Sequence, residues 1–218
     1  MSEAPPSTDS LIQHCRTTKA FDWHRESARL GRFRPHEGGR QRLTLLHQKY
    51  VDAFDRPRCD ERAKRMIGAI HLVDRLAVVI SAITWQELTE VQSIVLGDEH
   101  VRFRDGVAFS KGGLEVYGYH PDLQRAFSQK IKQDGQEELH PLVKSIRLYL
   151  DVCFFHPFQD GNARAARLAL QLILQRDNVF LKSLGPLFRI PLAAGSQEGY
   201  LAFLNLAKSL HCDSPAHP

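Results

Sequence analysis

Reactive side chains lie close together between two apolar stretches, from position 156 to position 167. They are a histidine, an aspartate, a Gly-Asn pair and two arginines three residues apart: His156, Asp160, Gly161, Asn162, Arg164 and Arg167. A histidine accepts protons near neutral pH, a carboxylate binds Mg²⁺, and paired arginines bind phosphate oxygens. The spacing therefore predicts a base, a metal ligand and a phosphate clamp in one short segment.

The apolar segment at 163–175 must position the clamp. It is apolar on most sides, which predicts a buried central helix. Gly161 and Asn162 supply turn and cap chemistry before it, so the unpaired N–H groups of its first turn would face an anion. Side chains on a helix lean toward its N-terminus, so Arg164 and Arg167 can both reach back over that end.

The base lies on the other side of this turn. His156 follows the apolar segment 142–155, and Pro157 ends that helix by restricting the residue before it. Asp160 would be repelled by a bare phosphate, and it becomes useful if Mg²⁺ bridges the carboxylate and the phosphate oxygens. These residue types point to transfer of a phosphate-containing group.

The segment resembles the signature of the Fic family, His-Pro-Phe-x-Asp/Glu-Gly-Asn-Gly-Arg-x-x-Arg. The resemblance implies a helical enzyme that transfers AMP, or less often another phosphate-containing group, from a nucleotide to a protein hydroxyl. It assigns these roles: His156 as general base, Phe158 as buried anchor, Asp160 as Mg²⁺ ligand, Asn162 at the α-phosphate, and Arg164 and Arg167 at the β- and γ-phosphates. Gly161 is expected to bind the nucleotide phosphates as part of the same turn.

One position departs from that signature. Ala163 stands where the family has its second glycine, which keeps the backbone N–H and adds a Cβ beside the phosphates. Ala163 is therefore still expected to contact the nucleotide, with the closeness of the fit in question. The Doc-like branch, which phosphorylates its target, has lysine at this point. Its absence favours nucleotidyl transfer.

The resemblance extends upstream and covers roughly residues 84–205. Residues 84–97 look like the family helix before the flap, and residues 101–106 look like the start of the flap. β-Favouring residues around a Lys-Gly-Gly turn predict a hairpin at 107–119. In the family this hairpin holds the target segment by strand addition. The expected contacts are at the turn: Lys111, Gly112, Gly113 and Leu114.

The fold class predicted is mainly α, a Fic-type helical bundle with a small β-hairpin flap at about 101–119. Apolar residues recur at helical spacing in five further segments, which are 41–54, 61–83, 122–133, 137–155 and 196–210. The expected organisation is a polar, basic N-terminal extension at 1–40, a catalytic domain at 41–212 and a frayed tail at 213–218.

Composition narrows the class of protein. The chain has 218 residues, 43% of them hydrophobic, and no long apolar run, so we expect one soluble domain without a membrane span. The proline-containing N-terminus does not look like a secretory signal, and four scattered cysteines have no metal-ligand spacing, which fits a cytoplasmic protein. The basic segment 16–42 lacks interleaved aromatic residues, so a nucleic-acid partner is not expected.

The function expected is protein adenylyl transfer from ATP, with Mg²⁺, to a Ser, Thr or Tyr hydroxyl of a target protein. Two alternatives stay open. The donor could supply UMP, GMP, phosphate or phosphocholine, because no motif marks the pocket for that group. The chain could also be a nucleotide-binding interaction module with little turnover, for which Ala163 is the only sequence support.

Control of the activity is a separate question. Many family members carry a Ser/Thr-x-x-x-Glu-Gly/Asn segment whose glutamate pairs with the second arginine, and none is found here. The nearest approach is at 209–214, with Asp213 in place of glutamate. The remaining explanations are a separate antitoxin-like inhibitory protein, an uninhibited enzyme, or a divergent internal segment. The first predicts that Arg167 is free in the isolated chain.

Overall fold

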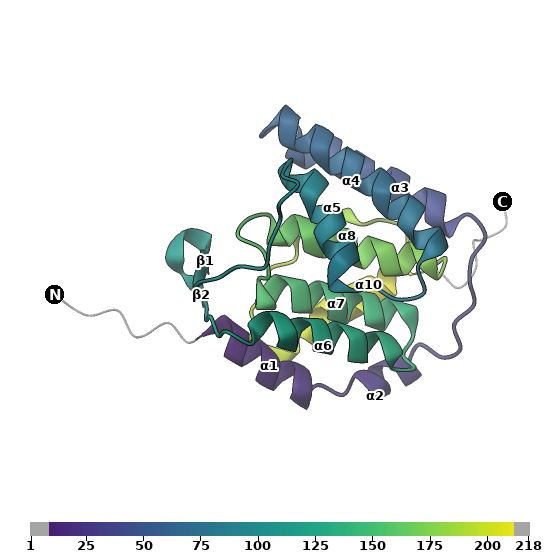
Figure 1. Cartoon of the computed structure of the whole chain (residues 1–218). Coiled ribbons are helices and arrows are strands. Elements are labelled where there is room, and N and C mark those ends of the chain that lie inside the picture. The colour runs from purple at the N-terminus through teal and green to yellow at the C-terminus, as the bar shows by residue number, and fades with distance from the viewer. Residues whose placement is uncertain (1–8, 212–218) are drawn as a thin grey trace.

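The computed structural model describes residues 9–211, and in this range helices dominate and a two-stranded sheet projects from one side of the bundle (Figure 1). This confirms the predicted mainly α fold with a small hairpin. The tail at 213–218, including Asp213 of the nearest inhibitor-like segment, lies outside the described residues.

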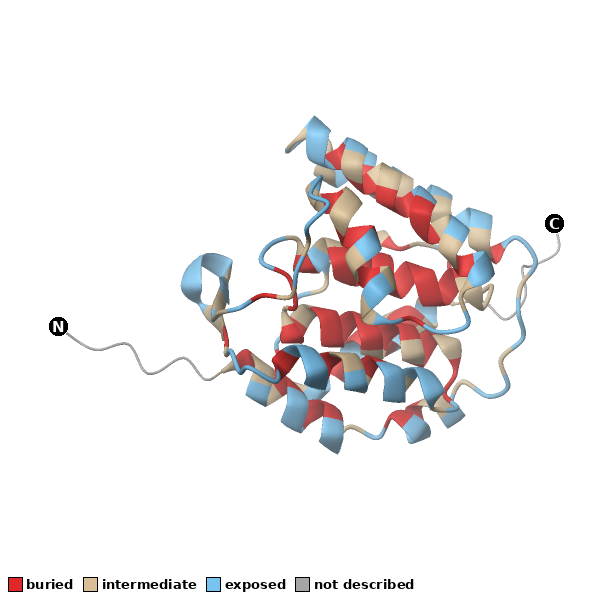
Figure 2. Cartoon of the chain, viewed as in Figure 1, coloured by how far each residue is buried: buried red, intermediate tan, exposed pale blue. Residues whose placement is uncertain are grey.

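Two helices form the centre, α7 (Pro141–Phe155) and α8 (Asn162–Arg176). They pack along each other, and the buried residues of the bundle concentrate on them (Figure 2). Apart from Ala163, Arg164 and Arg176, every residue of α8 is buried. The prediction of a buried central helix is therefore confirmed, and its two ends are where polar side chains reach the surface.

The other helices cover the central pair on two sides. On the side of α8 lie α3 (Gly39–Tyr50), which continues into a π-helical turn (Val51–Asp55), α4 (Asp60–Val79) and α5 (Trp85–Leu96). On the side of α7 lie α6 (Leu123–Gln136) and α10 (Gln197–Leu210), and the short α9 (Gly185–Arg189) contacts α3 and α10. These bounds agree with the predicted helical segments to within a few residues at most ends.

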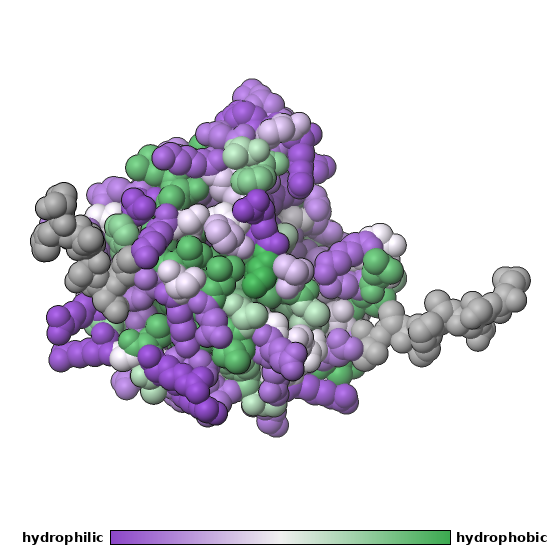
Figure 3. All heavy atoms as spheres, turned by 180° about the vertical axis from the view of Figure 1, so that it is seen from behind, coloured by the Kyte–Doolittle hydropathy of each residue, from purple (hydrophilic) through white to green (hydrophobic). Residues whose placement is uncertain are grey.

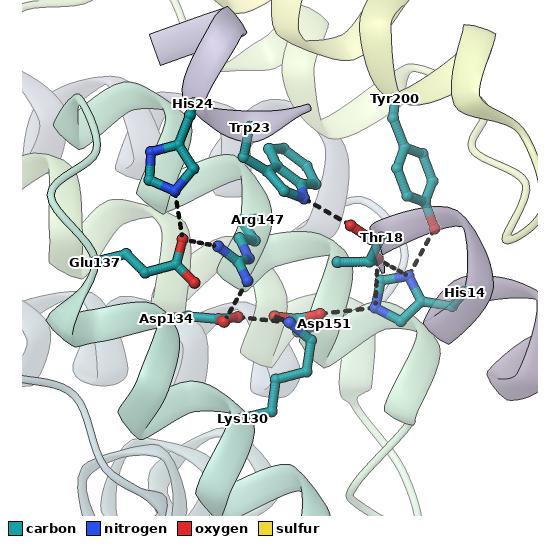
Figure 4. Close-up of polar contacts among 10 residues, drawn as sticks. All are labelled: His14, Thr18, Trp23, His24, Lys130, Asp134, Glu137, Arg147, Asp151 and Tyr200. Atoms are coloured by element: carbon teal, nitrogen blue, oxygen red, sulfur yellow. Dashed lines mark hydrogen bonds and ion pairs between the residues drawn. The ribbon is translucent and has the colours of Figure 1, made fainter. Parts of the chain in front are cut away.

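From residue 9 onward the N-terminal segment is part of the bundle, at variance with the extension expected at 1–40. Helices α1 (Ser10–Ala20) and α2 (Trp23–Ala28) both contact α7. The fully buried His14 ring links Asp151 of α7, 2.7 Å from its Nε2, and the Tyr200 hydroxyl of α10, 2.6 Å from its Nδ1 (Figure 4). The inward side chains of α1 are polar, so hydropathy alone does not reveal this packing.

A chain of charged side chains, half-buried except for the fully buried Asp151, ties α6 to α7 beneath these helices (Figure 4). Lys130 lies 2.6 Å from Asp134 and 3.2 Å from Asp151, and Arg147 lies 2.6 Å from Asp134 and 2.7 Å from Glu137. Each carboxylate in the chain therefore has a cationic partner, as burial requires. Asp151 lies five residues before His156, so this network also fixes the end of α7 that carries the base.

The face opposite to that of Figure 1 carries apolar residues in separate patches among hydrophilic side chains (Figure 3). Within residues 9–211, none of the helices combines the length and the apolar character needed to cross a bilayer.

Candidate active site

The predicted base is His156, the residue that terminates α7. Its backbone adopts a left-handed conformation, with φ 51° and ψ 55°, which turns the chain sharply before Pro157. The ring Nδ1 lies 3.3 Å from the Cys153 carbonyl, so Nδ1–H donates to that oxygen and Nε2 is left as the acceptor. Burial, with the nearby charge of Arg104, holds the pKa of His156 below its usual value. The ring is therefore uncharged at neutral pH and can accept a proton.

A tyrosine from the flap covers the histidine ring. The rings of Tyr117 and His156 stack with centroids 4.1 Å apart and planes 17° from parallel. The Tyr117 hydroxyl donates to Glu115 at 2.7 Å and lies 3.1 Å from the Ser110 hydroxyl. The inner face of the flap thus holds the base in place. The sequence marked residues 107–119 only as β-favouring, and nothing in the pattern singled out Tyr117.

The flap is the hairpin that the sequence predicted. Strand β1 (Ala108–Ser110) pairs antiparallel with β2 (Glu115–Tyr117), and Ala108 lies opposite Tyr117. The connecting turn has positive φ at Lys111, Gly112 and Gly113. Lys111 pairs with Glu115 at 2.8 Å, and Leu114 is 80% exposed at the tip. Target contacts at these four turn residues stay a prediction.

One buried arginine joins the flap to the loop between α7 and α8. Arg104, only 2% exposed, donates from Nε to the His156 carbonyl at 2.8 Å and from Nη2 to the Gly118 carbonyl at 2.5 Å. Its Nη1 donates to the Gly106 carbonyl, and its backbone N–H donates to Pro157 at 2.9 Å. Arg104 therefore connects both ends of the flap, at Gly106 and Gly118, to the backbone carbonyl of His156. Sequence reasoning placed Arg104 at the start of the flap and gave it no role.

Helix α1 holds the same end of the flap. Asp9 caps α1 by accepting from Leu11 N at 2.9 Å, and the same oxygen accepts from Gly118 N at 3.0 Å. A Cβ on Gly118 would lie 2.0 Å from Asp9 Oδ2, so a larger residue here would displace the Asp9 carboxylate from this contact. The N-terminal helix therefore contributes directly to the position of the flap.

The loop between α7 and α8 is closed by Asn162. Its side-chain oxygen accepts from Phe158 N at 2.9 Å, and its nitrogen donates to the Phe158 carbonyl at 2.7 Å. Phe158 is fully buried and stacks on Trp85, with centroids 5.0 Å apart, as expected of an anchor. Asn162 thus shapes the loop, and its contact with an α-phosphate stays a prediction.

The turn before α8 requires glycine at position 161. Gly161 has φ 77°, and a Cβ there would lie 2.6 Å from Gln92, whose amide donates to the Asp160 carbonyl at 2.8 Å. Gly161 N donates to Asp160 Oδ1 at 2.6 Å. In the first turn of α8, Arg164 N and Ala165 N donate to the Gly161 carbonyl, whereas the N–H groups of Asn162 and Ala163 precede any helical acceptor and suit an anion.

Asp160 presents its carboxylate to solvent beside these groups. Its side chain is 69% exposed, and Oδ2 lies 3.3 Å from Nη2 of Arg164. Within residues 9–211 no three His, Cys, Asp or Glu side chains gather as a metal cage. One accessible carboxylate near a phosphate site still fits Mg²⁺, which takes one or two protein carboxylates and completes its shell with phosphate and water.

The two arginines of the predicted clamp lie at the same end of α8. Arg164 donates to the Val95 carbonyl at 3.4 Å as well as pairing with Asp160. Arg167 donates from Nη1 to Asp55 Oδ2 at 3.0 Å, and its guanidinium lies over the ring of Tyr50. The prediction that Arg167 is free is therefore wrong. The hypothesis of a separate inhibitory protein rested on that prediction and loses its support.

A hollow of about 370 Å³ lies between the flap and the start of α8. Its walls include the base and its stacking partner, the first residues of α8 and an apolar segment from the loop after α9, which are His156, Tyr117, Asn162, Ala163 and residues 190–192. Ala163 is exposed on this wall, so its Cβ is accessible to a ligand in the hollow. The structure thus brings together the base, the N-terminus of α8 and an apolar surface.

The comparison with protein families decides which fold this site belongs to. Residues 82–174 match the Fic/DOC family. This chain is a Fic-domain protein. The resemblance of the segment 156–167 to the Fic signature is confirmed, and the Fic match includes the helix before the flap, the flap itself and most of α8.

Curated relatives of the Fic domain are named protein adenylyltransferase Fic. The one from Drosophila mojavensis is 30% identical over 132 residues, which are 57% of this chain and 24% of that protein. The one from Nematostella vectensis is 31% identical over 102 residues, 44% of this chain and 23% of that protein. This chain therefore spans about a quarter of the length of these relatives.

Solved structures share the Fic fold at low sequence identity. IbpAFic2 in complex with adenylylated Cdc42 superposes with a TM-score of 0.58 at 16% identity, covering 94% of this chain and 72% of that chain. A Fic domain containing signaling protein from Bacteroides thetaiotaomicron has a TM-score of 0.51 at 14% identity, covering 93% and 92%. The likeness thus extends over nearly the whole chain, well beyond the signature segment.

Proposed function

We propose that this Fic-domain protein is an adenylyltransferase that transfers AMP from ATP to a Ser, Thr or Tyr hydroxyl of a target protein. The observation that carries the proposal is the arrangement of His156, whose Nε2 is left as acceptor while its Nδ1–H is held by the Cys153 carbonyl. A neutral ring in the wall of the hollow is suited to accept the proton of an attacking hydroxyl.

The proposed step is a single displacement at the α-phosphorus. The acceptor oxygen bonds to the α-phosphorus, the bond from that phosphorus to the bridging oxygen of the β-phosphate breaks, and pyrophosphate leaves. Nε2 of His156 takes the hydroxyl proton. Arg164 and Arg167 neutralise the departing phosphates, and the N–H groups at the start of α8 hold the reacting phosphate.

Asp160 is the residue that would hold Mg²⁺, which supplies positive charge between the phosphates when it is bound. The existing contacts of Asp160 orient it for this role, because Gly161 N and Arg164 Nη2 each bind one of its two oxygens and leave further lone pairs open.

The protein acceptor is supported by the flap. Phe109 is 63% exposed and Leu114 is 80% exposed on the hairpin beside the base, which suits a chain that adds along the hairpin. The structural neighbour IbpAFic2 is seen with adenylylated Cdc42, a protein target. We therefore place the acceptor segment along the flap, with its hydroxyl directed at His156.

Regulation by a divergent internal segment is the explanation that the geometry favours. Asp55 occupies Nη1 of Arg167 from the π-helical turn after α3, so a phosphate must take this group from it. The Arg167–Asp55 pair is also compatible with a nucleotide-binding module that has little turnover. The labelling experiment distinguishes such a module from a regulated transferase.

The test is transfer of label from nucleotides to protein. The purified chain is incubated in cell lysate with Mg²⁺ and ATP labelled at either the α- or the γ-phosphate. Label retained only from the α-position supports adenylyl transfer, and label from the γ-position alone contradicts it. Parallel reactions with α-labelled UTP and GTP and with CDP-choline distinguish the other donors. His156→Ala must abolish the labelling while near-UV circular dichroism shows an intact fold.

A further inference from the structure

A second hollow is lined by the two clamp arginines and does not include His156. It has a volume of about 250 Å³ and lies between the start of α4 and the start of α8. Four arginines, one aspartate and one cysteine line it, which are Arg58, Arg62, Arg164, Arg167, Asp55 and Cys59. The Fic signature contributes only two of these arginines, so the chain supplies two more from outside it.

The two additional arginines are not used by the fold. Within residues 9–211, neither the Arg58 nor the Arg62 side chain makes an ion pair or a hydrogen bond, and both are exposed. Neighbouring Arg56, in contrast, pairs with Asp52 and Asp60. Free guanidinium groups on the wall of a hollow are available to a ligand.

The buried wall of this hollow also has unused hydrogen-bonding capacity. The Arg167 side chain is 9% exposed, and its Nε has no partner. Burial lowers the pKa of Arg164 from its usual value, and the like charges of Arg62 and Arg167 lower it further. An anion in the hollow would satisfy Nε and relieve this repulsion, because guanidinium groups bind phosphate through parallel N–H···O bonds.

The volume suits a phosphate chain. It is several times the roughly 30 Å³ that a water molecule occupies in the liquid. The single carboxylate, Asp55, is already paired with Arg167, so the unbalanced charge of the lining is positive. A polyanion with several oxygens is the ligand that such a lining selects.

We propose that Arg58 and Arg62 complete a four-arginine pocket for the terminal phosphates of a nucleoside triphosphate, and that the same pocket binds inorganic pyrophosphate and tripolyphosphate without a nucleoside. This rests on the proposed function for the identity of the donor, and it goes beyond it by assigning two residues outside the signature. Because Arg58 and Arg62 add two guanidinium groups to the two that the signature supplies, a longer phosphate chain binds more tightly than a shorter one.

The experiment is calorimetric titration of the purified chain with inorganic tripolyphosphate, pyrophosphate and phosphate. We expect tripolyphosphate to bind tightest. The double variant Arg58→Ala with Arg62→Ala should weaken tripolyphosphate binding at least tenfold and leave phosphate binding nearly unchanged. Each arginine that is removed should also lower the salt dependence of tripolyphosphate binding. The readout needs no transfer activity, so it stands apart from the labelling experiment.

The matched control is Arg75→Ala, an exposed arginine on the same helix about 20 Å from Arg62 that does not line the hollow. Equal losses in the control and the double variant would mean nonspecific attraction and would overturn the proposal, as would unchanged binding in the double variant. If tripolyphosphate binding depends on Arg58 and Arg62 but no nucleotide labels a protein, the pocket stands and the transferase proposal fails. If labelling succeeds with the same KM for ATP in the double variant, the pocket assignment fails alone.

Discussion

Arg167 of α8 donates to Asp55 across 3.0 Å, which joins the last turn before α4 to the helix of the Fic signature. The Arg167 side chain is 9% exposed and that of Asp55 is 20% exposed, so the pair is shielded from solvent. The guanidinium also lies 5.1 Å from the centre of the Tyr50 ring. Arg167, the proposed phosphate ligand, is thus held in its position by residues from outside the signature.

Removing the carboxylate should favour nucleotide binding. In Asp55→Asn the ion pair is lost and Arg167 becomes available to phosphate, so we expect the KM for ATP to fall by roughly tenfold, as loss of a charged competitor implies. The free energy of unfolding should also fall, by about 1–3 kcal/mol, because a buried charge loses its partner. Steady-state labelling and urea denaturation measure the two effects.

The control for this change is Asp52→Asn in the same turn. Asp52 pairs with Arg56 on the surface and does not line the hollow, so its KM should match that of the unchanged protein. A KM for ATP that stays constant in Asp55→Asn would mean that Asp55 only positions Arg167.

The pH dependence of kcat/KM should report the neutral form of His156. Burial lowers the pKa of His156 below its ordinary value of about 6.5, and only the unprotonated ring accepts a proton. Activity should therefore persist as the pH falls to 6.5 and decline only below it. His156→Ala should reduce turnover by about 10²- to 10⁴-fold. A midpoint above 6.5 would contradict the assignment.

Substitution of Tyr117 should change the acidic midpoint of the same pH profile of kcat/KM. Tyr117→Ala exposes the histidine ring, so the acidic midpoint should rise toward 6.5, whereas Tyr117→Phe keeps the stacked ring and should keep the midpoint. Equal profiles for both variants would show that the stack does not set the pKa of His156.

Arg104 should matter for both stability and catalysis. In Arg104→Met the carbonyls of His156 and Gly118 lose a buried donor, at a cost of about 1–3 kcal/mol for each unsatisfied group. We expect a lower free energy of unfolding and a lower kcat with little change in the KM for ATP. Arg104→Lys should restore little, because an ammonium lacks the planar fork. A loss confined to KM would contradict a positioning role.

The stability of the protein should fall with acid because of His47. This ring is fully buried, and burial with the nearby charge of Arg167 lowers the pKa of His47 to about 3. The unfolded chain binds a proton near pH 6.5 and the folded chain does not, so stability is present above 6.5 and is lost as the pH falls toward 3. The expected slope is about 1.4 kcal/mol per pH unit within that window.

The check is thermal or urea unfolding across pH 3–7. His47→Gln removes the titrating group and should flatten that part of the profile, whereas His71→Gln, on an exposed position of α4, should leave it unchanged. A profile of unaltered slope in His47→Gln would assign the acid sensitivity to other groups.

The helical architecture was largely predictable because it rests on local patterns. Apolar spacing located α8 and five other helices, and the Lys-Gly-Gly turn located the flap, since positive φ at Gly112 and Gly113 is a local requirement. The helices α1 and α2 were not predicted, because their inward faces carry residues such as His14 and Thr18 that look like surface residues until a partner is known.

The sequence by itself determined which residues can do chemistry here, because a base, a carboxylate and two arginines within twelve positions share one turn whatever surrounds them. Only the tertiary structure decided what holds them. Asp55 meets Arg167 from 112 positions away, Arg104 donates to the carbonyl of His156, and Arg58, from the turn before α4, and Arg62, from α4, line one hollow with Arg164 and Arg167. Such contacts between distant segments depend on how helices pack, and no periodicity along the chain encodes them.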